Sequence, residues 1–303
     1  MADAAQSIFF VVDGKELEVK SWLLAFTLAR HHRVGRDVSL IAYVTDRSHA
    51  DLDPATRAIY AAAGVEMRRL PTPDGVWAMP YPHGNKILAA ALPRTSQRST
   101  FLGTDMICQA SITDISPGDP HEVFVIPEGR RTWGKKVEDW TPAYAFFDLP
   151  MPADRVTLMR GRNVEYLPYF NAGFISFSDL ALAQDGKAFG RLWPDAARRF
   201  DFHCPVDNKR PWLDQITLPL VMALHGMDCL ILPESYNYSI SNRPELTSLP
   251  QARMVHYHRP SFFHTMPGAA DLIAMLMDSV PLQHHDAMDL LLAVHFAATG
   301  DED

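Results

Sequence analysis

Short apolar runs alternate with longer segments of helical periodicity in the first third of the chain. The run 7–12 is short, apolar and rich in β-branched or aromatic residues, which is typical of a buried strand, and 38–45 and 65–70 are predicted to be the second and third strands. Segments 17–32 and 54–63 lie between them and are predicted to be helices. A further helix over residues 85–92 is expected to lead into a strand that ends at Gly103. This rhythm predicts an α/β fold with a mostly parallel sheet and helices on both faces.

The second half of the chain continues with a strand over 169–177 and a long helix. Apolar residues of that helix repeat at 3.6-residue spacing from 189 to 200, which indicates core scaffold. By contrast, segment 110–167 has many aromatic residues and prolines but little periodicity, so it is predicted to be an irregular insertion. It could form a small core of its own, or an aromatic wall that binds an acceptor. No repeat or linker divides residues 1–303, so we expect one domain, with helices and an acidic tail over 269–303.

Composition narrows the class of protein without naming one. With 303 residues and 47% hydrophobic content, the chain can bury a substantial core. Its net charge of -8 argues against nucleic acid as a partner. Three cysteines without metal-type or disulfide-type spacing suit a reducing cytoplasm. The apolar run 8–12 is too short for a signal peptide or a membrane span. No GxGxxG follows the first strand, which disfavours a nicotinamide or flavin site. We therefore predict a cytoplasmic protein without a transmembrane segment.

A carboxylate stands at the end of the fourth predicted strand, in the run Thr100-Phe-Leu-Gly-Thr-Asp-Met-Ile107. An unpaired charge in the core would cost several kcal/mol, so Asp105 is expected at the carboxyl edge of the sheet. Open α/β sheets bind their ligands at that edge. Alternatively, Asp105 only caps the next element.

Three later motifs give this acid a context. They are Tyr-Phe-Asn-Ala-Gly-Phe-Ile over 169–175, Trp-Leu-Asp-Gln over 212–215 and Val-His-Tyr-His over 255–258. Their order and chemistry resemble the metal-dependent GT-A-fold glycosyltransferases of the glycogenin and lipopolysaccharide galactosyltransferase kind. The resemblance spans about residues 7–263. It implies a GT-A-like, mostly parallel mixed sheet flanked by helices. It also implies retaining transfer of a hexose from a nucleotide sugar, UDP-hexose above all, to an acceptor whose class (glycan, lipid, small molecule or protein) stays open.

The resemblance assigns a divalent metal to Asp105 and His256. A carboxylate with an imidazole favours Mn²⁺ over Mg²⁺, although Mg²⁺ stays open. His258 would lie on the same strand face if the strand continues, and is a reserve ligand. Two other interpretations remain: His256 as a hydrogen-bonded core histidine, and a zinc site that would lack a third ligand at usable spacing.

The chain departs from the family at the metal motif, because Gly103 replaces the first acid of Asp-x-Asp. Glycine could let the nucleotide ribose approach closely, and Thr104 could add a hydroxyl. A complete Asp-x-Asp does occur at 51–53, but Pro54 and a helical run follow it. Asp53 is therefore predicted to be a helix N-cap.

Donor-binding residues follow from the resemblance. It places Lys86 and Arg259 near the diphosphate and Asp13 near the base or ribose. The alternatives are ordinary surface basic residues and an Asp-Gly turn. The Lys-Pro-Trp element that relatives carry after the His-Tyr run is absent.

The catalytic assignments rest on the last two motifs. Asp214 and Gln215 are expected in the first turn of a helix that follows Pro211, directed out of the core. In retaining relatives the Asp binds donor-sugar hydroxyls and the Gln lies under the anomeric carbon. Asn171 with Ala172 and Gly173 would flank the sugar. N-capping is the structural alternative for Asp214. Two other functions stay open: a nucleotide-sugar-binding protein that has lost catalysis, and an inverting transferase with Asp214 as base.

Overall fold

The computed structural model describes residues 5–115, 117–160, 163–241 and 251–297. The chain packs into two compact units. Unit 1 comprises Met1–Pro71, Leu102–Asp114 and Pro233–Asp303, and unit 2 comprises Thr72–Phe101 and Ile115–Leu232. That residues 1–303 form one domain stays a prediction. No helix within the described ranges is both long and apolar enough to cross a bilayer.

Unit 1 begins with a parallel three-stranded arrangement in the order β1-β2-β3. Its strands are β1 (Gln6–Val12), β2 (Val38–Thr45) and β3 (Val65–Leu70). Helices α1 (Lys15–His31) and α3 (Pro54–Ala63) connect them and pack on each other, with the short helix α2 (Asp46–His49) before α3. These bounds agree with the predicted elements to within two residues. Asp53 caps α3 by accepting a hydrogen bond from the Ala55 N–H at 2.8 Å, so the N-cap prediction is confirmed.

A second, small sheet in unit 1 joins segments that are far apart in sequence. Its order is β11-β12-β5, formed by β11 (Tyr238–Ser239), β12 (Met254–His256) and β5 (Met106–Cys108). Because β12 runs antiparallel to β5 with His256 opposite Met106, residue 256 lies next to the turn that holds Asp105.

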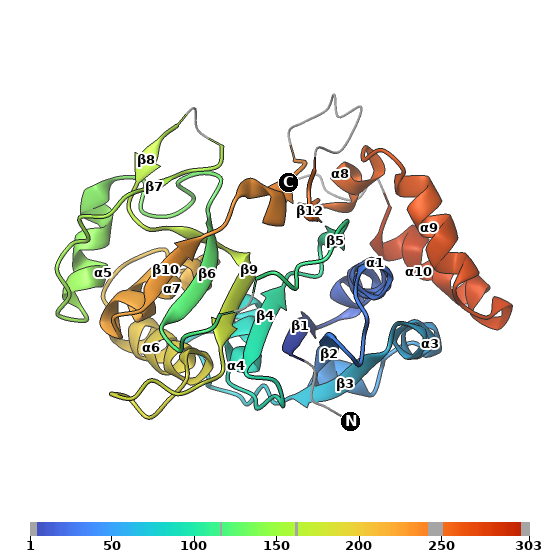
Figure 1. Ribbon diagram of the computed structural model, residues 1–303, viewed down its shortest axis with the longest axis horizontal. Helices are drawn as coiled ribbons and strands as arrows, with labels where there is room; N and C mark the ends of the chain where they lie inside the picture. Colours follow the sequence, from blue (N-terminus) through green and yellow to red (C-terminus); the bar gives the residue numbers. More distant parts are fainter. Residues whose placement is uncertain (1–4, 116, 161–162, 242–250, 298–303) are drawn as a thin grey trace. The chain divides into compact units, whose positions relative to one another are not determined.

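The C-terminal part of unit 1 is helical, as expected. It contains α8 (Pro260–His264), α9 (Ala269–Asp278) and α10 (His285–His295). Helices α9 and α10 contact α1, and Figure 1 shows them beside it. The predicted acidic tail, 301–303, lies outside the described residues.

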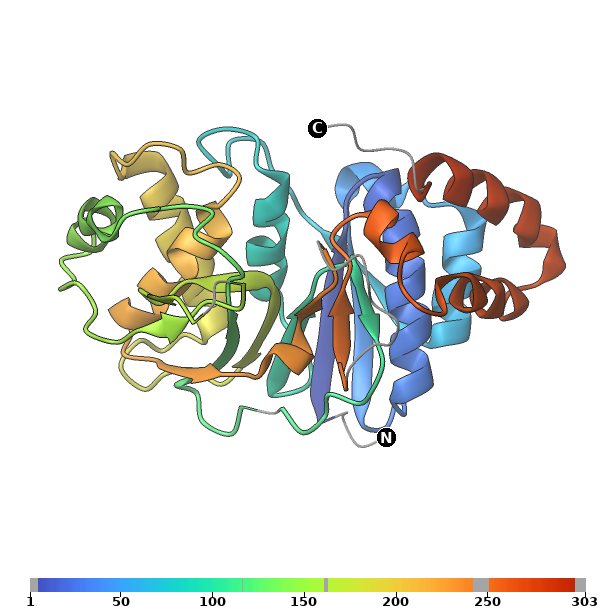
Figure 2. The same cartoon turned by 90° about the horizontal axis from the view of Figure 1, so that it is seen from above.

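Unit 2 is built on four strands in the order β10-β6-β9-β4. They are β4 (Arg98–Leu102, whose last residue falls in unit 1), β6 (Glu122–Pro127), β9 (Phe170–Ser178) and β10 (Asp228–Ile231). Strand β6 runs parallel to β10 and antiparallel to β9, so the sheet is mixed. The helices are α4 (Asn85–Ala90), α5 (Thr141–Ala145), α6 (Phe189–His203) and α7 (Leu213–Leu224). Helix α6 packs on α4 and α7, and α7 also contacts β9 (Figure 2). The predicted class, a mostly parallel mixed sheet flanked by helices, is confirmed.

Segment 110–167 is not irregular throughout, and that expectation is wrong at β6. Its apolar residues, Val-Phe-Val-Ile over 123–126, form a short strand that pairs on both sides. The two-residue strands β7 (Val156–Thr157) and β8 (Glu165–Tyr166) follow. The aromatic residues gather inward, with the rings of Trp133 and Trp140 at 4.8 Å and Trp140 fully buried. This burial supports the interpretation of a small core.

Candidate active site

Unit 1 carries a cluster of possible metal ligands: Asp105, His256 and His258. Their ligand atoms all lie within 4.8 Å of one another. Asp105 sits in the turn between β4 and β5, and its Oδ2 lies 2.9 Å from the Nε2 of His256. Burial alone would raise the pKa of Asp105, but the charge and hydrogen bond of His256 outweigh it and hold that pKa well below its usual value. One carboxylate and two imidazoles form a set that fits a divalent cation.

His258 reaches this cluster in a way that the sequence did not predict. Strand β12 ends at His256, so His258 does not share its strand face, as it would have done if the strand continued. Instead, His258 adopts a left-handed backbone with φ of 61°. Its ring stacks on that of His256, with centroids 3.7 Å apart and planes inclined by 23°.

Two polar side chains from the β11 region orient these rings. Asn237 Oδ1 lies 2.8 Å from His256 Nδ1, and Ser239 Oγ lies 2.6 Å from His258 Nε2. His256 is buried and contacts Asp105 and Asn237, an arrangement that fits a metal ligand and also fits a hydrogen-bonded core histidine, so its role as a ligand stays a prediction.

The other residues predicted in unit 1 have varied surroundings. Asp13 follows β1, and its nearly buried carboxylate bonds the guanidinium of Arg47 at 2.5 and 2.6 Å and the hydroxyl of Thr45 at 2.8 Å. Although burial would raise the pKa of Asp13, these contacts lower it. Thr104 is buried in the turn before Asp105, and Gly103 is half-buried there. Roles in donor binding remain predictions for these three, and for Arg259, which is exposed at the start of α8.

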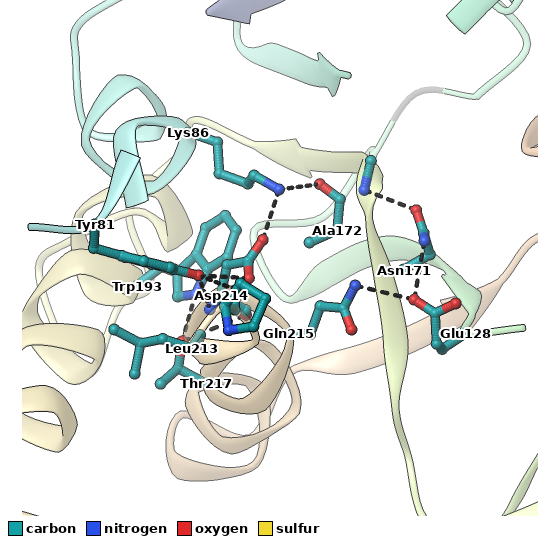
Figure 3. A network of polar contacts seen from close by, with 12 residues as sticks. Tyr81, Lys86, Glu128, Asn171, Ala172, Trp193, Leu213, Asp214, Gln215 and Thr217 are labelled. Carbon is teal, nitrogen blue, oxygen red and sulfur yellow. Dashed lines mark hydrogen bonds and ion pairs between the residues drawn. The ribbon is translucent and has the colours of Figure 1, made fainter. Parts of the chain in front are cut away.

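Asp214 is the centre of a polar network in unit 2 (Figure 3). It lies in the first turn of α7 but is only 3% exposed, and its Oδ2 accepts a hydrogen bond from Lys86 Nζ at 2.6 Å. Tyr81 donates its hydroxyl to Oδ1 at 2.7 Å. Burial, followed by the charge of Asp214, raises the pKa of Tyr81 far above its ordinary value, so the phenol keeps its proton.

The expectation that Asp214 points out of the core is therefore wrong, and so is the N-cap alternative. The N-cap residue of α7 is Trp212. A buried carboxylate is tolerated here because an ammonium and a phenol compensate for the lost water.

Gln215, the next residue, is held by a second set of contacts. Its Nε2 donates to Glu128 Oε2 at 3.0 Å, and its Oε1 accepts from the Tyr169 hydroxyl at 2.6 Å. The same Glu128 oxygen accepts from Asn171 Nδ2 at 3.0 Å, while Asn171 Oδ1 accepts from the Gly173 N–H at 2.9 Å. Figure 3 shows Glu128 facing both amides. These contacts fix the orientation of the Gln215 and Asn171 side chains.

Lys86 binds within unit 2 as well, to Asp214 and to the carbonyl oxygen of Ala172 at 3.3 Å. Its charge is thus balanced by Asp214. The predicted contact with a diphosphate stays a prediction.

Sequence reasoning missed Glu128 and Tyr81. Glu128 was open to detection, because it directly follows an apolar strand, which is the same signal that singled out Asp105. Tyr81 lies in a proline-rich loop between β3 and α4, where no periodicity distinguishes it.

Comparison with known proteins supplies the family. Residues 8–226 match the family described as the Rhodobacterales glycosyltransferase domain. This chain therefore belongs to that glycosyltransferase family. A search of curated proteins finds no match.

Solved structures agree on the fold. The galactosyltransferase LgtC, in complex with donor and acceptor sugar analogs, is 14% identical, with a TM-score of 0.57, covering 92% of this chain and 99% of LgtC. The bifunctional glycosyltransferase WbbM is 13% identical with a TM-score of 0.58, over 96% of this chain and 52% of WbbM. Mouse xyloside xylosyltransferase 1 is 11% identical with a TM-score of 0.50, over 85% and 98% of the two chains. At such identities the likeness concerns the fold alone, and it confirms the GT-A-like prediction.

Proposed function

We propose that this glycosyltransferase moves a hexose from UDP-hexose to an acceptor, with retention of anomeric configuration and with help from a divalent cation. The observation that carries the proposal is the buried Asp214–Lys86 pair beside an orientation-locked Gln215. A charge buried at a cost in solvation, next to a fixed amide, is typical of a preorganised reaction centre.

Asp105 and His256 would hold the cation, and their donor atoms fit it. When bound, a divalent ion neutralises charge that grows on the diphosphate as the glycosidic bond breaks. Carboxylate oxygen with imidazole nitrogen suits Mn²⁺ better than Mg²⁺.

Asp214 would supply fixed negative charge for the sugar. As the bond between the anomeric carbon and the diphosphate oxygen breaks, positive charge develops on the ring, and a nearby carboxylate stabilises it. The acceptor oxygen then bonds to the anomeric carbon on the face that the diphosphate leaves, and the acceptor proton passes to the departing diphosphate. Gln215 and Asn171 hold the sugar in place, with Glu128 as the positioning residue for both amides.

The inverting alternative has less support from the geometry. A general base needs an oxygen directed at the acceptor hydroxyl. In Asp214, however, Oδ1 accepts from Tyr81 and Oδ2 from Lys86.

A thermal-shift panel tests donor binding. UDP-glucose, UDP-galactose and UDP should each be compared with and without Mn²⁺, with NAD and ATP as controls. At about 100 times its Kd, a ligand stabilises the fold by about 2.7 kcal/mol, which is readily detected. We expect a UDP-sugar to raise the melting temperature most and UDP to raise it partly. A response to NAD but to no UDP-sugar would contradict the proposal.

Turnover then separates an enzyme from a binding protein. Release of UDP from the stabilising sugar nucleotide should depend on Mn²⁺ and on Asp214. Stabilisation without any UDP release, across glycan, lipid, small-molecule and protein acceptors, would instead identify a nucleotide-sugar-binding protein.

A further inference from the structure

The predicted metal motif is one ligand short. Gly103 offers no side chain where the Asp-x-Asp pattern has its first acid, so this motif contributes only Asp105. With His256, that gives two protein ligands, whereas a stably held transition-metal ion commonly has three or four.

His258 has the features of the missing ligand. Its ligand nitrogen belongs to the same cluster, within 4.8 Å of the other two ligand atoms. Its backbone φ of 61° is uncommon for a residue other than glycine, and backbone strain of this kind gathers at functional sites. The left-handed backbone at His258 places its ring on that of His256. In an extended strand the ring would lie farther along the chain, away from His256.

The contacts around the two imidazoles also match those of metal ligands. A ligating histidine usually bonds a fixed polar group through its other ring nitrogen. In His256, Nδ1 contacts Asn237 Oδ1 while Nε2 lies toward Asp105. Ser239 likewise contacts Nε2 of His258. Asn237 and Ser239 lie in or beside β11. Because β11 pairs with β12, the small sheet places both polar side chains next to the two imidazoles.

We propose that His258 is the third protein ligand of the cation, in place of the acid that Gly103 lacks. The site then offers two imidazoles and one carboxylate. Mg²⁺ prefers oxygen ligands, so two imidazoles shift the preference of the site away from Mg²⁺ toward transition metals, toward Mn²⁺ slightly and toward Co²⁺ and Zn²⁺ more strongly. The inference deepens the proposed function, on which it rests, by naming the ligand set and the metals that it selects.

Cobalt provides a readout that needs no glycosyl transfer. Full-length protein should be titrated with Co²⁺, with and without UDP, and followed by visible absorption; binding of Mn²⁺ should be followed by loss of the free-ion EPR signal. The test variant is His258→Gly, because glycine removes the imidazole and readily adopts positive φ. His49→Ala, which removes an imidazole elsewhere in unit 1, is the matched control, and circular dichroism verifies folding.

We expect His258→Gly to weaken Co²⁺ and Mn²⁺ binding by at least about 10-fold, the lower end of losses seen when a metal's surroundings are disturbed, and to change the Co²⁺ spectrum. His49→Ala should match the wild type. The double variant Gly103→Asp/His258→Gly should regain Mn²⁺ binding and bind Mg²⁺ more tightly than the wild type, because a carboxylate then replaces the imidazole.

An unchanged Co²⁺ affinity and spectrum in His258→Gly would overturn the assignment, as would a wild-type protein that binds no Co²⁺ at millimolar concentration in either condition. These outcomes differ from failure of the proposed function. If the protein turns over a UDP-sugar but the Co²⁺ spectrum is the same in His258→Gly and the wild type, only the ligand assignment fails. If metal binding depends on His258 but no UDP-sugar binds, only the proposed function fails.

Discussion

Replacing Asp214 by Asn should lower both stability and turnover, and the structure sets the size of each loss. Asp214 and Lys86 pair at 2.6 Å with side chains only 5% and 17% exposed. Removing one partner of a buried pair typically costs about 3–5 kcal/mol. Asn can still accept from Tyr81, and Lys86 reaches some solvent, so we expect a loss of about 2–3 kcal/mol in the free energy of unfolding. Turnover should fall about 100- to 1000-fold, the usual effect of removing one preorganised electrostatic contact.

A second substitution separates the two effects. Lys86→Met in the Asp214→Asn background removes the orphaned ammonium, and replacing a whole buried pair is often nearly neutral. Stability should therefore recover to within about 1 kcal/mol of the wild type, while turnover stays low because the carboxylate is still missing.

Urea denaturation measures the stability, and UDP release at saturating donor measures the turnover. The matched control is Asp195→Asn, which breaks an exposed pair with Lys187 at a similar 2.7 Å. That change should cost less than about 0.5 kcal/mol and leave turnover unaltered. Wild-type turnover in the stable double variant would refute the catalytic role of the Asp214 charge. An Asp214→Asn variant as stable as the Asp195→Asn control would refute the contribution of the buried Asp214–Lys86 pair to stability.

Three other variants test separate parts of the account. Glu128→Gln should reduce turnover by about 10- to 100-fold with little change in stability, because the acceptor that orients Gln215 becomes an amide; equal kcat and KM to the wild type would argue against positioning. His256→Ala should weaken Mn²⁺ binding by at least about 10-fold in an EPR titration, and unchanged binding would exclude it as a ligand. Asp13, whose pKa lies below its ordinary value of 3.8, contributes stability that is complete above about that pH and is lost as pH falls through the lower pKa of the folded state. Asp13→Asn should therefore flatten the acid limb of a stability-against-pH curve, and identical limbs would show that its pair with Arg47 contributes nothing.

The first helices and strands could be predicted because their limits are set by local chemistry. Helix α3 begins at Pro54 after the Asp53 cap and ends at Gly64, which takes the left-handed conformation with φ of 69°. Strands β2 and β3 likewise begin and end where predicted.

The surroundings of the candidate residues could not be predicted, because they depend on distant partners. Asp214 was expected to face outward, but Lys86, 128 positions earlier, neutralises it in the interior. His258 was a reserve ligand only if its strand continued, and nothing in its sequence neighbourhood signals the left-handed backbone that brings it to His256 instead. Glu128 is the exception, because the apolar strand before it could have been recognised, and it was missed because the whole segment 110–167 was interpreted as irregular.

The anomeric configuration of the transferred hexose tests the central claim most directly. Proton NMR should follow the full-length protein with Mn²⁺ and the UDP-hexose that stabilises it, from the first turnovers onward. The coupling constant of the anomeric proton in the initial product reports the configuration before any mutarotation. We predict that the α configuration of the donor appears first in the product, together with free UDP. A first product of β configuration would contradict the retaining reaction assigned to Asp214 and Gln215.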